Sequence, residues 1–405
     1  MKATAACYNL PMDELEPLLA SLVAIDSVNP DLVPGARGEG EIAAFVADWL
    51  TRKGLEVHTE DSGRAGRPNV VAVARGTRGG RTLMLNSHMD TVGVAGMDAP
   101  FAPRRKGGRL YGRGAMDTKA ALASFMCSVA DARDQHLRGD VILAAVVDEE
   151  YASAGTEAVA AKWKADAAIV GEPTGLEIVT DHKGFVWFDI ETTGVAAHGS
   201  LPGVGVDAIV KMGPVLVGIQ EIATRLARGA THPSLGPGSI HASLIQGGQE
   251  LSSYPASCRL SIERRTIPGE EVEAVEKELQ DLLSGIGGRD PAFKVTLRRG
   301  LARPSLETPR ETPIVQALSR QVRKAMGREP VFAGMGGWMD SALLAAAGIP
   351  AVIFGPSGAG LHGVEEWVDL SSVAACRSII TETIKSSAHD RSHEYGNALH
   401  GTAPG

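Results

Sequence analysis

Short apolar runs that end abruptly in polar or charged residues are the feature that most constrains the fold of this chain. The runs occupy residues 70–74, 82–85, 141–147 and 167–170, and a helical pattern at 119–132 separates two of them. Strands that are covered on both faces have this continuous apolar pattern. Helices and strands that alternate in this way predict an α/β domain with a mostly parallel sheet.

The pattern changes in the middle of the chain. Between residues 183 and 299 the expected order is strand, helix, strand, strand, helix and strand, which describes an α+β unit of βαββαβ type. The first pattern then returns, so we predict one domain at 1–182 and 300–388 that is interrupted by a second at 183–299. A length of 405 residues suits two domains. Residues 389–405 are polar and lack periodicity, and we expect a mobile tail there.

Composition argues against several classes of function. The formal net charge is -8 and no basic stripe occurs, so we expect neither nucleic acid nor an anionic membrane as a partner. The four cysteines form no CxxC pair, which argues against a zinc ribbon or a redox motif. We find no signal-peptide pattern and no apolar run long enough to span a bilayer, and we therefore expect a cytoplasmic protein.

Five candidate metal ligands occur in separate motifs, most of them directly after an expected strand. They are His88, Asp117, Glu150, Glu172 and His362. Functional groups in open α/β sheets collect at the carboxyl ends of the strands, so we expect these side chains to converge. Two imidazoles and three carboxylates suit Zn²⁺, Co²⁺ or Mn²⁺. A carboxylate can also bridge a pair of such ions about 3.5–4 Å apart, as two-metal hydrolases require.

Each motif also has a purely structural explanation. His88 could be an ordinary loop histidine, Asp117 could cap the helix that follows it, and the acids at 148–150 could form a solvated loop. Their joint occurrence favours the metal pair. Asp90 is two residues from His88, so it can hold the ring nitrogen of His88 that does not bind metal. Adjacent acids leave a strand end on different sides, so one of them can bind a metal while its neighbour faces a water.

The ordered motifs resemble those of the M20 metallopeptidases, a family that includes acetylornithine deacetylases, succinyl-diaminopimelate desuccinylases, aminoacylases and glutamate carboxypeptidases. The matching segments are SHMDT at 87–91, GRGAMDTK at 112–119, DEE at 148–150, GEPT at 171–174 and the late His362. The resemblance implies a di-metal hydrolase that cleaves the amide bond of an N-acyl amino acid or a small peptide-like substrate. A dipeptidase or carboxypeptidase-type exopeptidase and a non-peptide amide hydrolase remain as alternatives.

The resemblance also implies how the ligands divide between two divalent ions, for which we expect Zn²⁺, with Co²⁺ or Mn²⁺ as alternatives. It implies that His88 binds one ion, that His362 binds the other, and that Asp117 bridges them. Glu150 completes one site and Glu172 the other.

Further roles follow from the same resemblance. It makes Glu149 the general base and Asp90 the residue that orients His88. It also implies a cis peptide bond between Asp117 and Thr118.

The domain at 183–299 resembles the lid, or dimerisation, domain of the family. The segment GVAAHG at 194–199 matches the lid histidine motif, which implies that His198 stabilises the oxyanion in the site of a partner subunit of a homodimer. The segment 263–270 implies that Arg265 clamps a substrate carboxylate, with Arg264 as an alternative.

The segment 334–341 falls where members of the family build part of the substrate pocket. Trp338 is large and apolar, which favours an apolar or aromatic acyl-amino acid, although Trp338 could equally belong to the core. Asp340 could bind a substrate amine or cap the next helix.

Overall fold

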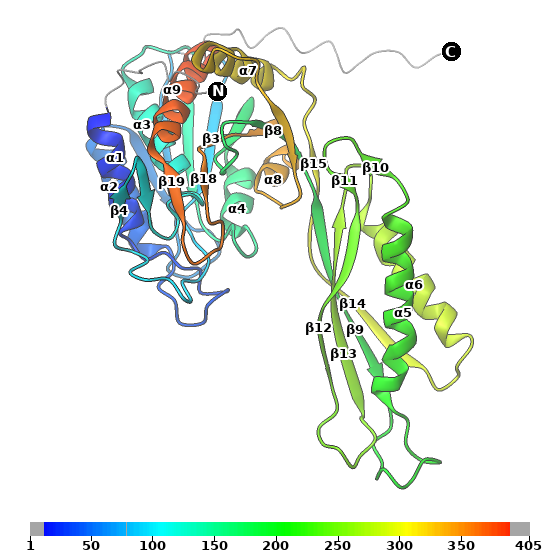
Figure 1. The fold of residues 1–405 in the computed structure, drawn as a ribbon. Coiled ribbons are helices and arrows are strands. Elements are labelled where there is room, and N and C mark those ends of the chain that lie inside the picture. The colour runs from blue at the N-terminus through cyan, green and yellow to red at the C-terminus, as the bar shows by residue number, and fades with distance from the viewer. Residues whose placement is uncertain (1–11, 78, 389–405) are drawn as a thin grey trace, which may run out of the picture. The chain divides into compact units, whose positions relative to one another are not determined.

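The computed structural model describes residues 12–77 and 79–388, which form two compact units (Figure 1). Unit 2 consists of Asp181–Glu307 and Gly334–Trp338, and unit 1 holds the remaining described residues. The sequence pattern places the two main crossings after residues 182 and 299, whereas the structure places them after 180 and 307. The predicted mobile tail at 389–405 lies outside the described residues.

Unit 1 is built on a sheet of nine strands whose centre is parallel. The four central strands, in spatial order, are β6 (Val141–Val146), β3 (Leu83–His88), β7 (Ala167–Val170) and β17 (Ala351–Ile353). On one side the sheet continues with two antiparallel strands, β2 (Asn69–Ala74) and β1 (Glu56–Glu60). On the other side it continues with the antiparallel strands β8 (Ile178–His182) and β15 (Leu306–Glu307). A further strand, β16 (Phe332–Met335), also pairs with β8. Every residue of β2, β3 and β6 is buried, which explains the apolar runs at 70–74, 83–85 and 141–146 within them.

Helices cover both faces of this sheet (Figure 1). The main core lies under α1 (Met12–Val23), α2 (Gly40–Arg52), α3 (Lys119–Arg133), α7 (Pro313–Met326) and α9 (Leu370–Ala388). The other face packs against α4 (Ala154–Lys162) and α8 (Ser341–Ala346). No helix of the described chain has the length and apolar character needed to cross a bilayer.

A small antiparallel sheet stands beside the main one and carries two of the candidate ligands. Its strands, in order, are β18 (Gly358–Ala359), β19 (Trp367–Asp369), β5 (Arg109–Tyr111) and β4 (Arg104–Lys106). The loop between β18 and β19 holds His362, and the segment that leaves β5 leads to Asp117. Because β5 and β19 are paired, these two loops start from neighbouring strands.

Unit 2 is an antiparallel sheet of four strands with two helices on one face. The strands, in order, are β12 (Ser239–Gly247), β13 (Ser257–Thr266), β9 (Gly184–Thr193) and β14 (Lys294–Arg303), and the helices are α5 (Ala208–Leu226) and α6 (Val272–Gly287). A short hairpin of β10 (Thr231–His232) and β11 (Gly236–Pro237) is inserted before β12. The predicted fold class, an α/β domain interrupted by a βαββαβ unit, is confirmed.

Candidate active site

The five candidate ligands lie at one end of the central sheet of unit 1. His88 ends β3, Glu150 follows β6, and Glu172 follows β7. These three strands run parallel, so their carboxyl ends meet at the same edge. Asp117 comes just before α3, and His362 comes from the loop of the small sheet. The predicted convergence is therefore observed.

Asp117 lies between two pairs of ligands and turns one carboxylate oxygen toward each. Its Oδ1 is 3.2 Å from Nε2 of His88, and Oε1 of Glu172 is 3.7 Å from the same nitrogen. Its Oδ2 is 3.4 Å from Nε2 of His362, which is 3.3 Å from Oε2 of Glu150. One histidine and one glutamate accompany each oxygen, an arrangement that suits a bridging carboxylate between two cations.

The charges of this cluster fit metal ions. Oε1 of Glu150 and Oε1 of Glu172 are buried without a hydrogen-bond partner, which is costly for a carboxylate. Burial, together with the charge of Asp117, raises the pKa of Glu150 to about 7, and burial raises the pKa of Glu172 well above its usual range. Hydrogen bonds to Asp117 and Glu150 raise the pKa of His362 to about 10. Divalent cations would supply the positive charge that the cluster otherwise draws from bound protons.

The structural alternatives for these motifs do not hold. Thr118, not Asp117, is the N-cap residue of α3, and no side-chain capping bond is made there. His88 is 1% exposed and Asp148 is fully buried, so neither belongs to a solvated loop. The peptide bond between Asp117 and Thr118 is cis, as predicted.

Asp90 holds both His88 and the acidic segment. Nδ1 of His88 lies 3.0 Å from the backbone oxygen of Asp90 and 3.4 Å from its Oδ1. The Asp90 carboxylate also accepts hydrogen bonds of 3.1 Å from the backbone N–H groups of Glu149 and Glu150. Asp90 therefore fixes the imidazole ring and, in addition, the backbone of the candidate base.

Glu149 has the electrostatic surroundings of a proton acceptor. Its carboxylate lies near His88 and Glu172, with one ligand atom of each within 4.8 Å of the others. Burial and the negative charge of Glu172 raise the pKa of Glu149 well above its usual range. A carboxylate that takes up protons more readily than usual suits general base catalysis.

Beneath the acidic segment lies a buried polar network that the sequence did not reveal. Asn29 donates from Nδ2 to Oδ2 of Asp90 at 2.8 Å and to Oδ1 of Asp148 at 3.1 Å. Arg67 binds Glu39 through two hydrogen bonds of 2.6 and 2.8 Å and reaches Asp148 at 3.0 Å. The partners of Asp148 are arginines and an asparagine, so the charge of this acid is balanced by side chains of the protein. The run of three acids in the sequence drew attention to this segment. It gave no indication of which distant residues bind Asp148.

Unit 2 carries three of the remaining candidates, which are His198, Arg265 and Trp338. His198 is exposed, and its Nδ1 lies 2.8 Å from Oγ of Ser200. Arg265 is partly exposed and pairs with Glu263 at 2.6 Å. Arg264 is 2% exposed and is bonded to Glu270, so its role is structural. Arg265 is the more exposed of the two arginines, and the Glu263 carboxylate binds its Nε and Nη2.

The two residues of the segment 334–341 differ in surroundings. Trp338 donates from Nε1 to the backbone oxygen of Pro304 at 2.9 Å, and its ring meets Phe185 edge-on at 5.9 Å. Asp340 is buried, accepts a hydrogen bond from the hydroxyl of Thr156, and makes no capping bond. Burial raises the pKa of Asp340 to about 6. The other carboxylate oxygen of Asp340, Oδ1, is buried without a hydrogen-bond partner among the described residues.

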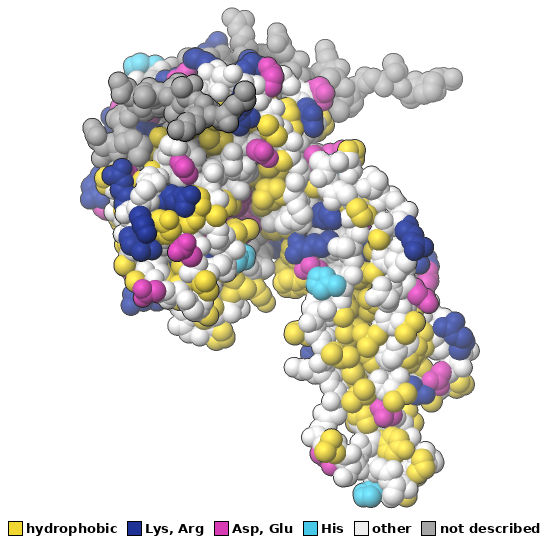
Figure 2. Space-filling view, viewed as in Figure 1, with side chains coloured by type: hydrophobic (Ala, Val, Ile, Leu, Met, Phe, Trp, Pro, Cys, Tyr) yellow, Lys and Arg dark blue, Asp and Glu magenta, His cyan; other side chains and the backbone are white. Residues whose placement is uncertain are grey.

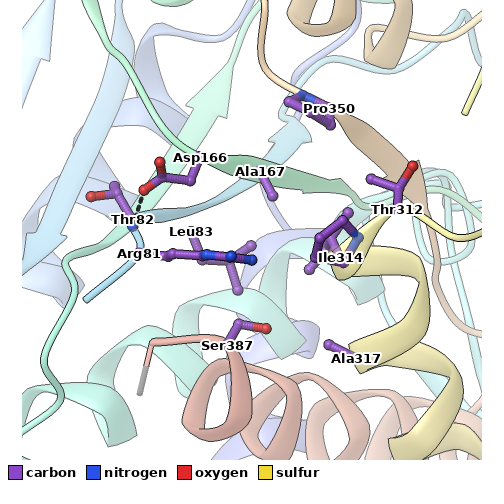
Figure 3. Close-up of a pocket in the computed structure, with 11 residues that line it drawn as sticks. Arg81, Thr82, Leu83, Asp166, Ala167, Thr312, Ile314, Ala317, Pro350 and Ser387 are labelled. Atoms are coloured by element: carbon purple, nitrogen blue, oxygen red, sulfur yellow. Dashed lines mark hydrogen bonds between the residues drawn. The ribbon is translucent and has the colours of Figure 1, made fainter. Parts of the chain in front are cut away.

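A separate cavity of about 250 Å³ lies at the opposite end of the sheet (Figure 3). Leu83 and Ala167, at the amino ends of β3 and β7, line it together with Arg81 and Ile314. Asp166 at its rim accepts a hydrogen bond of 2.7 Å from the backbone of Thr82. This cavity holds none of the candidate ligands and is not the candidate active site.

The fold and the ligand cluster define a hydrolase whose catalytic domain is interrupted by a second, α+β domain. A model of peptidase family M20/M25/M40 matches residues 84–386, and the chain belongs to this family. The predicted class, a metal-dependent enzyme that hydrolyses amide bonds, is thereby confirmed.

Individual relatives agree with this class. The acetylornithine deacetylase of Myxococcus xanthus is 29% identical over 385 residues, which cover 91% of this chain and 96% of the relative. The N-formyl-4-amino-5-aminomethyl-2-methylpyrimidine deformylase of Bacillus subtilis (strain 168) is 29% identical over 406 residues, which cover 92% and 94%. A dinuclear metal-binding M20 peptidase from Bacillus subtilis superposes with a TM-score of 0.71 at 17% identity, over 93% of this chain and 98% of the other. The last similarity shows the fold.

Proposed function

We propose that this protein is a deacylase that removes the acyl group from an N-acyl amino acid by hydrolysing its amide bond. The observation that carries the proposal is the position of Asp117 between two pairs of ligands, each with one histidine and one glutamate. The deacetylase and deformylase relatives, whose names describe removal of small acyl groups, support this reaction over an exopeptidase.

Two metal ions would be held by these five side chains. His88 and Glu172 would bind one ion, His362 and Glu150 the other, and Asp117 both. Nitrogen and carboxylate ligands favour Zn²⁺, with Co²⁺ or Mn²⁺ as alternatives. When bound, the ions would lower the pKa of a water and polarise the scissile carbonyl.

Protons would be moved by the protein. Glu149 would take the proton of the attacking water and deliver it to the leaving amine, which its position beside His88 and Glu172 supports. Asp90 would keep the ring of His88 oriented through its contacts with Nδ1. His198 would donate a hydrogen bond to the oxyanion as the tetrahedral intermediate forms.

The substrate would be recognised through unit 2. Arg265 would clamp the carboxylate of the amino acid, because a guanidinium matches a carboxylate in two parallel hydrogen bonds. The rings of Phe185 and Trp338 lie beside the cations of this region: Arg265 is 5.3 Å from the first ring and Arg303 is 5.8 Å from the second. Apolar surface next to positive charge favours an apolar or aromatic N-acyl amino acid.

The active form would be a homodimer assembled through unit 2. β12 is an edge strand with an open row of backbone groups, which is a template for pairing with a second copy. Leu244 and Ile245 of this strand are 66% and 52% exposed, and Val210 and Val217 of α5 are 67% and 60% exposed. Figure 2 shows apolar side chains gathered on the face of unit 2 in view. Exposed apolar patches of this kind mark protein interfaces.

We place the enzyme in the cytoplasm as part of this proposal. Cys127, Cys258 and Cys376 are free thiols and buried, which suits a reducing compartment.

The test is Glu149→Ala assayed against a panel of N-acyl amino acids with added Zn²⁺, Co²⁺ or Mn²⁺. We expect the wild type to release free amino acid, and the variant to keep its metal content while its kcat falls by about 10²–10⁴-fold. Metal content is measured by elemental analysis. Normal turnover in the variant would refute the role of Glu149, and no hydrolysis of any member of the panel by the wild type would refute the proposed substrate class.

A further inference from the structure

We infer that Glu366 is a positioning residue that sets the metal site formed by His362, Glu150 and Asp117. It does so by tying the backbone that carries Asp117 to the loop that carries His362. The inference rests on the proposed function, because it concerns the same pair of ions. It assigns a role to a residue that is not part of the segments compared with the family above.

The Glu366 carboxylate is buried and surrounded by hydrogen-bond donors. Its Oε2 accepts from Nη1 of Arg113 at 2.8 Å and from the backbone N–H of Gly114 at 3.0 Å. Its Oε1 accepts from the backbone N–H groups of Met116 and Asp117 at 2.8 and 3.1 Å. Glu366 is 1% exposed, so these bonds are shielded from water. Four donors occupy its two oxygens, and Glu366 therefore acts through its neighbours and not as a ligand itself.

The same two segments are also joined by hydrogen bonds to backbone oxygens of the loop. The backbone N–H of Gly112 donates to the backbone oxygen of Glu366 at 3.1 Å. Nη2 of Arg113 donates to the backbone oxygen of Gly363, the residue after His362, at 3.0 Å. The pairing of β5 with β19 continues directly into these contacts. Glu366 and Arg113 thus form a buried ion pair that joins the two loops.

His362 needs such support more than His88 does. His88 ends a buried central strand and is held by Asp90, whereas the side chain of His362 is 52% exposed and its backbone has a φ of +56°. A partly exposed histidine on a loop keeps its position only if the loop is fixed. Because Glu366 is on that loop and also holds the backbone of Asp117, it determines how His362 faces Oδ2 of the bridging carboxylate.

The test compares Glu366→Gln with the matched control Glu365→Gln. Both variants remove one negative charge by the same substitution, at adjacent positions, but Glu365 is exposed. Metal-free protein of each variant and of the wild type is titrated with Co²⁺, following binding by calorimetry and by the visible spectrum of the bound ion. Circular dichroism confirms that each protein is folded.

We expect the wild type and E365Q to bind two ions. E366Q is expected to bind the first ion normally and the second about 10–100-fold more weakly, with a changed spectrum for the second equivalent, which is the usual effect of losing a residue that orients metal ligands. Should E366Q fail to fold, Arg113→Lys provides the second variant: it keeps the positive charge but loses the reach to Gly363, and the same site is expected to weaken.

Two unperturbed ions in E366Q, or equal weakening of both ions in folded protein, would overturn the inference while leaving the proposed function intact. A wild type that binds fewer than two ions would overturn the proposed function and this inference with it.

Discussion

Lys119 shows how strongly burial can act on a single charged side chain. It is fully buried, and its ammonium group donates to the backbone oxygen of Ile25 at 2.8 Å. Burial lowers the pKa of Lys119 to about 7, although Glu366, Asp26 and Asp90 oppose the shift. In an unfolded chain the same group holds its proton up to about pH 10.4. Folding therefore releases this proton over the range between the two values.

The stability of the metal-free protein is expected to reflect this release. Between pH 7 and about 10 the unfolded state binds more protons than the folded state, so Lys119 makes the free energy of unfolding rise with pH. From pH 7 to 9 we expect a rise about 2 kcal/mol larger in the wild type than in Lys119→Met, which has a similar shape and no charge. Urea unfolding of both proteins at the two pH values measures it. Parallel changes in the two proteins would show that Lys119 keeps an ordinary pKa when folded.

At the scale of elements, the sequence predicted the parts whose pattern is local. The buried runs that became β2, β3, β6 and β7 were found because strands covered on both faces are continuously apolar. The short strand Arg104–Lys106 of the small sheet is exposed and carries no such pattern. The strand β14 continues past residue 299, the predicted end of the second domain, to Arg303, because pairing with β9 holds it. Both strands form because they pair with a neighbouring strand in the fold, and not because of a pattern in their own sequence.

The candidate site likewise contains residues that the sequence predicted and residues that it did not. His88, Asp117 and Glu172 stand beside recognisable strands or helices, so their convergence followed from the sheet. Asn29 and Glu366 are single polar residues far along the chain from their partners, and only the folded structure brings them to Asp90 and Asp117. Residues that hold ligands in place are therefore harder to predict than the ligands.

The edge strand β12 leads to a prediction about assembly. Ile245→Lys places a charge on the proposed dimer surface, and an unpaired charge is costly to bury. We expect the Kd of the dimer to rise at least about tenfold, equivalent to about 1.4 kcal/mol. Analytical ultracentrifugation measures it, with Val331→Lys, an exposed apolar position of unit 1, as the control. A dimer that is unchanged in I245K would show that β12 is not the interface.

At the scale of the whole molecule, the dimer would give each site residues from two chains. His198 is exposed on unit 2, whereas Glu149 belongs to unit 1, so a histidine that acts in the partner's site would make the two residues separable. His198→Ala and Glu149→Ala proteins, each inactive alone, are then expected to complement each other when mixed.

Random exchange of subunits would make half of the dimers mixed, and each of these would have one intact site out of two. We therefore expect roughly a quarter of the wild-type turnover in an equimolar mixture. The assay is hydrolysis after subunit exchange, which fluorescence energy transfer between labelled chains verifies. A mixture that exchanges subunits but recovers no activity would place His198 and Glu149 of the same chain in one site.

Arg64 and Arg67 neutralise Asp148 from within the protein, and Asn29 donates a hydrogen bond to it. Asp90 holds the two residues that follow, Glu149 and Glu150. The shape of the acidic loop therefore does not depend on the ions that it would bind. An enzyme built in this way can persist as a folded, inactive reserve and become active as soon as metal arrives. The supply of metal in the cell, and not the synthesis of new chains, would then set how fast its substrate is consumed.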